Sequence, residues 1–192
     1  MNDGFLKAAA LSPSLRVADC AYNTSQILSQ LKDAAARGVR LAVFPEFCLT
    51  GYTCGDLFLQ RTLQQGALDG LQTLLDASRE LDVVALVGLP LLVRGKLYNC
   101  AAVLCGGRLL GLVPKTYLPN YGEFYEKRQF TPGSTEVEGG RALQRSSQIS
   151  TPSTKLGIWR QRKSSEVPKG TSCPQTVTVS TSVLPGVNWR FS

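Results

Sequence analysis

The feature that most restricts the fold is a regular alternation of apolar runs with helical segments along residues 5–92. Apolar runs typical of buried strands occur at residues 5–12, 40–44 and 82–92. Apolar side chains recur at helical spacing in the intervening residues 23–39 and 59–82, and the second of these segments reads as one or two helices. Strands that alternate with long helices favour a layered α/β domain.

Single residues predict where several of these elements end. Asn23 or Thr24 is expected to cap the first helix, and Gly38 is expected to end it. Residues 98–115 predict two further strands joined by Gly106-Gly107, a dipeptide suited to a tight hairpin turn. The α/β domain should therefore close with an antiparallel pair.

The charge of the chain is concentrated in its last quarter. The net charge is +7, yet residues 1–140 carry 13 basic and 13 acidic side chains, whereas residues 141–192 carry 8 basic side chains and 1 acidic one. The second segment is rich in Ser, Thr and Pro, and its only apolar alternation is TVTVSTSV. We therefore predict a globular domain over residues 1–140 and a largely disordered basic tail over residues 141–192, with one short strand.

Composition and segment lengths exclude several kinds of site. Histidine is absent, which removes Ser-His and Cys-His catalysis and most zinc sites, so a catalytic base must be a carboxylate, a lysine or a tyrosine. None of the six cysteines forms a C-x-x-C pair, and we expect reduced thiols and no metal. Without a signal-peptide pattern or a bilayer-length apolar stretch, we expect a cytoplasmic chain that makes no membrane contact.

Two predicted strands end in a proline that is followed by a charged residue. Glu46 follows Pro45 in LAVFPEFCLTGY, and Lys115 follows Pro114 in LLGLVPKTY. Each charge taken alone fits a solvated loop residue, because charged side chains are mostly exposed. If both strands end at the same rim of a sheet, however, the carboxylate and the ammonium would compensate each other.

These two segments carry a family resemblance. VFPEFCLTGY, followed by PKTYLPNYGEFYEKRQFTPG, resembles the nitrilase or carbon-nitrogen hydrolase superfamily, and most closely the glutaminase domain of glutamine-dependent NAD synthetases. LYNCAAVLCGGRLLGLVPK is similar to that family as well. The resemblance covers residues 5–133 and implies a four-layer αββα sandwich, here C-terminally incomplete, that assembles into homo-oligomers.

The resemblance also implies roles for individual residues. Glu46 would be the general base, and Lys115 would stabilise the oxyanion. Glu126 would position the lysine and the attacking water, and Tyr121 would contact the substrate, L-glutamine. A cysteine thiolate would attack the side-chain amide, release ammonia and leave a thioester for hydrolysis.

The nucleophile itself is not identified. The family places it after a third apolar strand downstream of the lysine, followed by acidic residues, and no such segment occurs here. Cys173 lies at a suitable distance but sits in KGTSCPQT, without a preceding strand; Cys48 lies close to Glu46 but outside the family's position. We therefore expect an inactive fragment whose reading is truncated or has shifted frame after about residue 140.

The remaining expectations concern partners and alternative functions. No Ser-Gly-Gly-rich loop for ATP occurs, so we expect no cofactor on this chain; by resemblance, ATP and a synthetase domain belong to a full-length enzyme. One alternative is another carbon-nitrogen hydrolase, such as an aliphatic amidase. Another is a non-catalytic protein whose body and basic tail bind a partner or nucleic acid, which salt-sensitive binding of DNA or RNA by the tail would favour. Nucleic acid is the less expected partner, because residues 1–140 carry no net charge.

Overall fold

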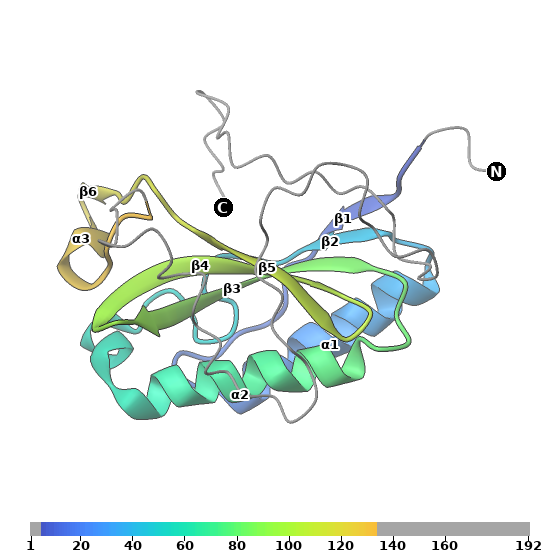
Figure 1. Ribbon diagram of the computed structural model, residues 1–192, viewed down its shortest axis with the longest axis horizontal. Helices are drawn as coiled ribbons and strands as arrows, with labels where there is room; N and C mark the ends of the chain where they lie inside the picture. Colours follow the sequence, from blue (N-terminus) through green and yellow to red (C-terminus); the bar gives the residue numbers. More distant parts are fainter. Residues whose placement is uncertain (1–4, 134–192) are drawn as a thin grey trace.

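The computed structural model describes residues 5–133, which form a five-stranded sheet with two helices against it (Figure 1). The elements are β1 (Ala8–Ala10), α1 (Cys20–Ala36), β2 (Leu41–Val43), the 3₁₀ helix η1 (Gly55–Leu59), α2 (Arg61–Ala77), β3 (Val84–Val93), β4 (Lys96–Cys105), β5 (Arg108–Pro114), β6 (Asn120–Tyr121), β7 (Phe124–Tyr125) and α3 (Glu126–Gln129). The sheet order is β1-β2-β3-β4-β5, with β1, β2 and β3 parallel and β4 and β5 antiparallel to their neighbours.

This arrangement confirms the predicted α/β class. The described residues provide one helix layer and one sheet, two of the layers expected in the αββα sandwich. β6, β7 and α3 lie together at one end of the sheet (Figure 1). The predicted boundary at residue 140 and the tail over residues 141–192 lie outside the described residues.

Helix α1 begins earlier than the sequence predicted. Its N-cap is Asp19, whose side chain accepts a hydrogen bond from the backbone N–H of Tyr22, so the predicted caps Asn23 and Thr24 are wrong. Asn23 instead lies inside the helix, fully buried, and bonds both the N–H and the C=O of Arg16. The predicted end is confirmed, since Gly38 follows the helix with a positive φ of 74°.

Helix α2 is a single helix that contains both of its glycines. A Cβ at Gly66 would lie 3.3 Å from the Cys20 side chain, and one at Gly70 would overlap the Thr24 hydroxyl. Both glycines thus let α2 approach α1 closely. This gain in packing offsets the ordinary cost of glycine in a helix, about 1 kcal/mol relative to alanine.

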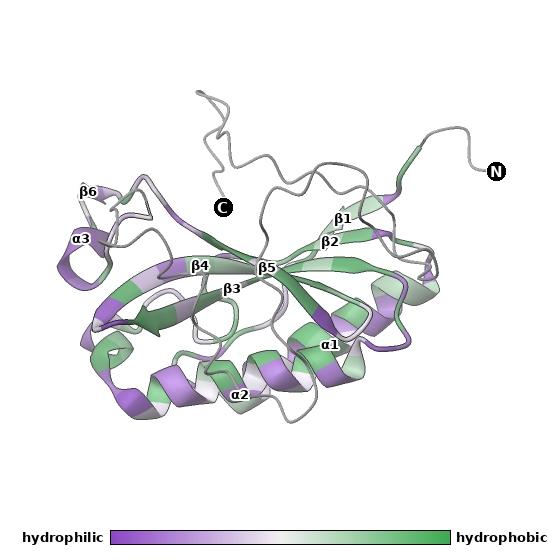
Figure 2. Cartoon of the chain, viewed as in Figure 1, coloured by the Kyte–Doolittle hydropathy of each residue, from purple (hydrophilic) through white to green (hydrophobic). Residues whose placement is uncertain are grey.

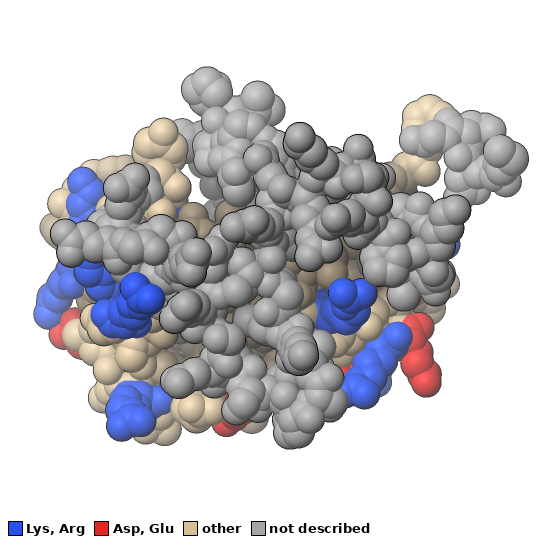
Figure 3. Space-filling view, viewed as in Figure 1, with Lys and Arg blue, Asp and Glu red and all other residues tan. Residues whose placement is uncertain are grey.

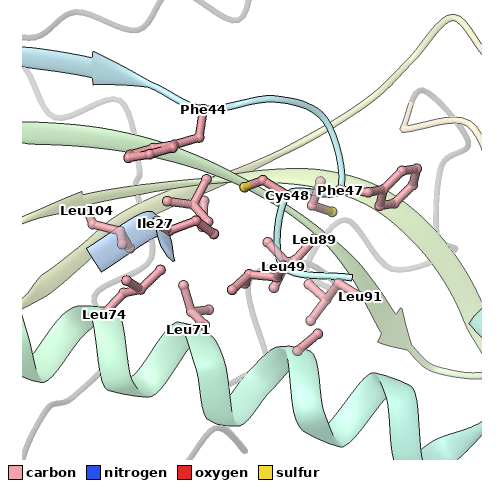
Figure 4. Close-up of a cluster of buried hydrophobic side chains, with 14 of the residues drawn as sticks. Ile27, Phe44, Phe47, Cys48, Leu49, Leu71, Leu74, Leu89, Leu91 and Leu104 are labelled. Atoms are coloured by element: carbon pink, nitrogen blue, oxygen red, sulfur yellow. The ribbon is translucent and has the colours of Figure 1, made fainter. Parts of the chain in front are cut away.

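The core lies between the helices and the sheet. Figure 4 shows Leu71 and Leu74 of α2 pointing toward the sheet, with Ile27 of α1 and Leu104 of β4 beside them. Figure 2 shows hydrophobic and hydrophilic residues alternating along both helices, as expected where one side of each helix is buried. A second, smaller cluster around Val84 and Val103 belongs to the other face of the sheet, because side chains alternate along a strand.

The predicted hairpin is confirmed. β4 and β5 are joined at Gly106 and Gly107, whose φ values of 54° and 73° fit the two left-handed positions of a type I′ turn. The turn starts the pairing of β5 with β4, and a β-bulge beside Val103 and Leu104 then shifts the register by one residue, so that Pro114 lies opposite Cys100. Lys115 consequently leaves the sheet beside the middle of β4.

The chain after β2 crosses β3 at Gly88. Leu49 donates to the Gly88 carbonyl at 3.3 Å, and the Gly88 N–H donates to the Cys48 thiol at 3.3 Å. A Cβ at Gly88 would lie 2.5 Å from the backbone nitrogen of Phe47 and 2.8 Å from the carbonyl oxygen of Pro45. Only glycine therefore lets the chain after β2 pass so close to β3. This close passage fixes the position of the backbone that carries Glu46.

Charges are mixed over the described surface. In the view of Figure 3, lysine and arginine side chains are spread over several separate places, with acidic side chains near some of them. Within residues 5–133, no helix has the length and apolar character needed to cross a membrane.

We predict that Gly88→Ala destabilises the protein by about 1–3 kcal/mol, because the new methyl group collides with backbone that cannot move aside easily. Gly111→Ala is the matched control, since Gly111 also lies in a strand of this sheet and a Cβ there meets nothing within 4 Å. Its effect should stay within about 0.5 kcal/mol. Urea unfolding followed by circular dichroism measures both, and equal effects would contradict the crossing.

Candidate functional site

Three charged residues from distant parts of the sequence meet at one rim of the sheet. Glu46 lies in the turn after β2, Lys115 follows the end of β5, and Glu126 begins α3. The Lys115 ammonium lies 2.8 Å from Glu46 Oε1 and 2.8 Å from Glu126 Oε1, donating a hydrogen bond to each. The predicted proximity of Glu46, Lys115 and Glu126 is thus confirmed.

Glu126 is the buried member of this cluster. Only 5% of its side chain is exposed, against 29% for Glu46 and 31% for Lys115. Its carboxylate accepts from Lys115 and from the Tyr52 hydroxyl at Oε1, the latter at 2.8 Å, and from the Asn99 amide at Oε2 at 3.3 Å. A buried carboxylate surrounded by three donors has its charge compensated.

The pKa of Lys115 reflects this environment. Burial lowers the pKa, but the hydrogen bonds and charges of Glu126 and Glu46 more than offset it, and the net pKa is raised above the usual value for lysine. Lys115 is therefore an ammonium throughout the physiological range. It presents a fixed positive charge at the rim of the sheet.

The turn that carries Glu46 is held by packing. Phe47 has a positive φ of 50°, a left-handed conformation that a bulky residue rarely adopts. Its ring packs against Phe58, Phe130 and Tyr52, with centroids 4.8, 5.0 and 5.9 Å away. Backbone strain of about 1–3 kcal/mol at such a position persists only where the surroundings enforce it, and it is concentrated at functional sites.

Tyr121 lies outside the hydrogen-bonded cluster. It is 69% exposed on β6, and its ring meets Phe124 edge-on at 5.7 Å, while Phe124 in turn contacts Tyr52 at 6.0 Å. Aromatic rings thus lead from the surface to the hydroxyl that donates to Glu126. The predicted contact of Tyr121 with a substrate stays a prediction.

The thiols of the described residues are not arranged for attack. Cys48 is fully buried behind Glu46 and bonds Gly88, and burial raises its pKa to about 12. Burial also raises the pKa of Cys100 to about 12 and of Cys20 to about 11, so these side chains are neutral thiols near pH 7. Cys173 lies outside the described residues.

Sequence reasoning missed two members of the cluster, Tyr52 and Asn99. Asn99 donates both to Glu46 Oε1 and to Glu126 Oε2. Tyr52 stands in the same conspicuous segment as Glu46, and burial, together with its bond to Glu126, raises the pKa of its hydroxyl, which stays a donor. The sequence does signal Asn99, because it is a polar residue within the apolar run LYNCAAVL. An amide buried in a strand needs hydrogen-bond partners.

The cluster combines a proton acceptor with a fixed cation. Within residues 5–133, Glu46 Oε2 makes no hydrogen bond, so this oxygen is free to take a proton. The neighbouring Lys115 could stabilise an oxyanion formed nearby. This geometry suits acyl transfer with a nucleophile supplied from elsewhere.

Comparison with known proteins shows the family to which the chain is similar. The sequence profile of a family described as carbon-nitrogen hydrolase matches residues 7–160. The glutamine-dependent NAD(+) synthetase of Mycobacterium tuberculosis is 42% identical over 133 residues, which cover 69% of this chain and 20% of the relative. That of Thermotoga maritima is 38% identical over 125 residues, which cover 65% of this chain and 21% of the relative. The chain thus spans about a fifth of the length of these relatives.

Solved structures share the fold. A glutamine-dependent NAD(+) synthetase from Cytophaga hutchinsonii aligns with a TM-score of 0.63 and 29% identity, covering 66% of this chain and 22% of that one. The synthetase from Acinetobacter baumannii, in complex with ADP, aligns with a TM-score of 0.60 and 33% identity over 67% of this chain and 24% of that one. An amidase from Nesterenkonia, at 22% identity and a TM-score of 0.55 over 67% of this chain and 48% of the amidase, shares the fold alone.

We predict that Lys115→Met destabilises the protein by at least about 2 kcal/mol, because it leaves the Glu126 carboxylate buried without its cation. Arg128→Met is the matched control, because it breaks an exposed ion pair with Asp56. The Arg128 side chain is 68% exposed and the Asp56 side chain 62%, so the loss of this pair should cost less than about 1 kcal/mol. Denaturant unfolding of both variants and the parent chain gives the comparison.

The pH dependence of this effect has a definite sign. The folded pKa of Lys115 is raised, so its contribution is complete below the unfolded value, about 10.5, and is lost as the pH rises through the folded value. The stability difference between the parent chain and Lys115→Met should therefore persist to about pH 10 and then shrink. A difference that closes between pH 7 and 9 would contradict the assignment of the ion pair.

Proposed function

Because the chain belongs to the carbon-nitrogen hydrolase family, we propose that Glu46, Lys115 and Glu126 form part of a glutaminase site that releases ammonia from L-glutamine. The observation that carries the proposal is the Lys115 ammonium held 2.8 Å from both carboxylates, beside a Glu46 oxygen that makes no hydrogen bond within residues 5–133. The 42% identity to the glutamine-dependent synthetase of Mycobacterium tuberculosis supports glutamine as the substrate.

The proposed mechanism assigns one step to each residue. Glu46 takes the proton of an attacking thiol, and the thiolate adds to the carbonyl carbon of the glutamine side chain. Lys115 stabilises the resulting oxyanion, while Glu126 holds Lys115 in place. Glu46 then returns the proton to the departing ammonia, and a water molecule cleaves the thioester to give glutamate.

Tyr121 is proposed to contact the glutamine. It stands at the exposed end of the ring contacts that lead to Tyr52 and Glu126. The ammonia would serve amidation in a synthetase domain of a longer protein. ATP would be used there, and this part of the site needs no cofactor of its own.

We further propose that the chain as given does not hydrolyse glutamine, because the nucleophile is missing from the described residues. Cys20, Cys48, Cys54 and Cys100 are buried, and burial raises the pKa of each. A thiol must ionise and approach the carbonyl carbon to about 3–3.5 Å before it can attack. None of these four thiols combines the two properties.

The first test is an assay of the purified chain for glutamate production from glutamine. We expect none above background, with the synthetase from Mycobacterium tuberculosis as the positive control. Turnover would refute the proposed inactivity. Loss of that turnover in Cys173→Ala or in Cys48→Ala would then identify the nucleophile.

The second test asks whether the cluster works once a nucleophile is supplied. Residues 5–133 should replace the equivalent segment of the Mycobacterium tuberculosis synthetase with retention of glutamine-driven NAD synthesis. Lys115→Met in this chimera should lower that activity by about 10²-fold or more, whereas synthesis from free ammonia serves as the internal control and should be unchanged. The assignment would be refuted if Lys115→Met lowered the glutamine-driven and the ammonia-driven synthesis equally, or if it lowered neither. Activity on aliphatic amides instead of glutamine would favour an amidase.

A further inference from the structure

Asn99 occupies an unusual place for a polar residue. It lies in the middle of β4, opposite Pro90 of β3, and its side chain is 4% exposed. Its neighbour Cys100 belongs to the core beneath the helices, so Asn99 faces the opposite side of the sheet. An amide buried there needs hydrogen-bond partners, and these define what the residue does.

Asn99 contacts every charged member of the cluster. Its amide nitrogen donates to Glu46 Oε1 and, at 3.3 Å, to Glu126 Oε2. Its backbone carbonyl accepts a hydrogen bond from the backbone N–H of Lys115 at 2.7 Å. One residue on an interior strand thus ties together three segments that are far apart in the sequence.

The chemistry of the partners fixes the orientation of the amide. Ionised carboxylates only accept hydrogen bonds, so the NH₂ group of Asn99 must face them. An asparagine provides two donors on one nitrogen without adding a charge. The carboxylates of Glu46 and Glu126 already share the Lys115 ammonium. An anionic side chain at position 99 would repel both carboxylates, and a cationic one would compete with Lys115 for them.

We propose that Asn99 is a positioning residue, whose amide holds the carboxylates of Glu46 and Glu126 on the two sides of Lys115. Its bond to Glu46 engages Oε1, the oxygen that also accepts from Lys115. Among the described residues, Oε2 is thereby left available for proton transfer. The positions of the two carboxylates do not depend on the proposed function. Only the proton transfer assigned to Glu46 rests on it.

The consequence of losing the amide falls on Glu46 first. Glu126 is buried and would still accept a hydrogen bond from the Tyr52 hydroxyl. Glu46 is 29% exposed, and within residues 5–133 its only donors are Lys115 and Asn99. Without Asn99, Glu46 can turn toward solvent. Lys115 would then lose one of its two anions, and its pKa would fall.

The first experiment measures the titration of Lys115 in the whole chain carrying ¹³Cε-labelled lysine. In Asn99→Ala the midpoint of Lys115 should fall by about one pH unit relative to the parent chain, since an opposite charge at contact distance raises a lysine pKa by about that much. Lys32, on the exposed side of α1, is the internal control in the same spectra. An unchanged or raised midpoint for Lys115 in the folded variant would overturn the proposal.

The second experiment uses Asn99→Asp, which keeps the shape of the side chain but replaces its donors with a third carboxyl beside Glu46 and Glu126. Repulsion should raise the pKa of the introduced carboxyl in the folded state above its unfolded value of about 3.9. The folded state then binds more protons, so the stability of the variant relative to the parent chain should fall as the pH rises above about 4. A difference independent of pH would overturn the proposal, even if Asn99→Ala does not fold.

Neither experiment depends on turnover. A failure of the glutaminase proposal would leave the titration of Lys115 and the pH dependence of Asn99→Asp as predicted here. A failure of the Asn99 proposal would leave the activity of the chimera intact as a separate result. The two ideas can therefore be rejected independently.

Discussion

A buried carboxylate at Glu126 is the constraint on which the site depends. Taking a carboxylate out of water costs several kcal/mol unless a cation and hydrogen-bond donors replace the lost hydration. Lys115, Tyr52 and Asn99 provide that replacement, and they come from three different segments. The turn after β2, the centre of β4 and the end of β5 must therefore be in place together.

The sheet makes this convergence possible. Gly88 lets the turn that carries Glu46 cross β3 at close range. The β4–β5 hairpin, with its register shift beside Val103 and Leu104, brings Lys115 beside Asn99. Glu46 and Lys115 thus rest on segments that are hydrogen-bonded to strands. Support of this kind keeps the Lys115 ammonium and the Glu46 carboxylate in a fixed relation. The proposed stabilisation of an oxyanion would need such a fixed relation.

Much of this could be predicted from sequence, because apolar periodicity and strand-ending Pro-Glu and Pro-Lys pairs are local signals. The α/β class, the hairpin, and the meeting of Glu46 with Lys115 followed from them, whereas the place of Glu126 beside Lys115 was expected only from the family resemblance. The errors have physical causes. Asp19 rather than Asn23 caps α1, because Asn23 is needed inside the helix to bond Arg16, a contact that no local pattern reveals. Asn99 went unnoticed because its partners lie 53 and 27 residues away in the sequence.

The measurement that tests the account most directly is a double-mutant cycle on Lys115 and Glu126. Unfolding free energies of the parent chain, Lys115→Met, Glu126→Gln and the double variant give the coupling between the two side chains. If Lys115 is the cation that allows Glu126 to be buried, the coupling should be about 1–3 kcal/mol, with the double variant more stable than the sum of the single effects implies. Effects that add within about 0.5 kcal/mol would contradict the account.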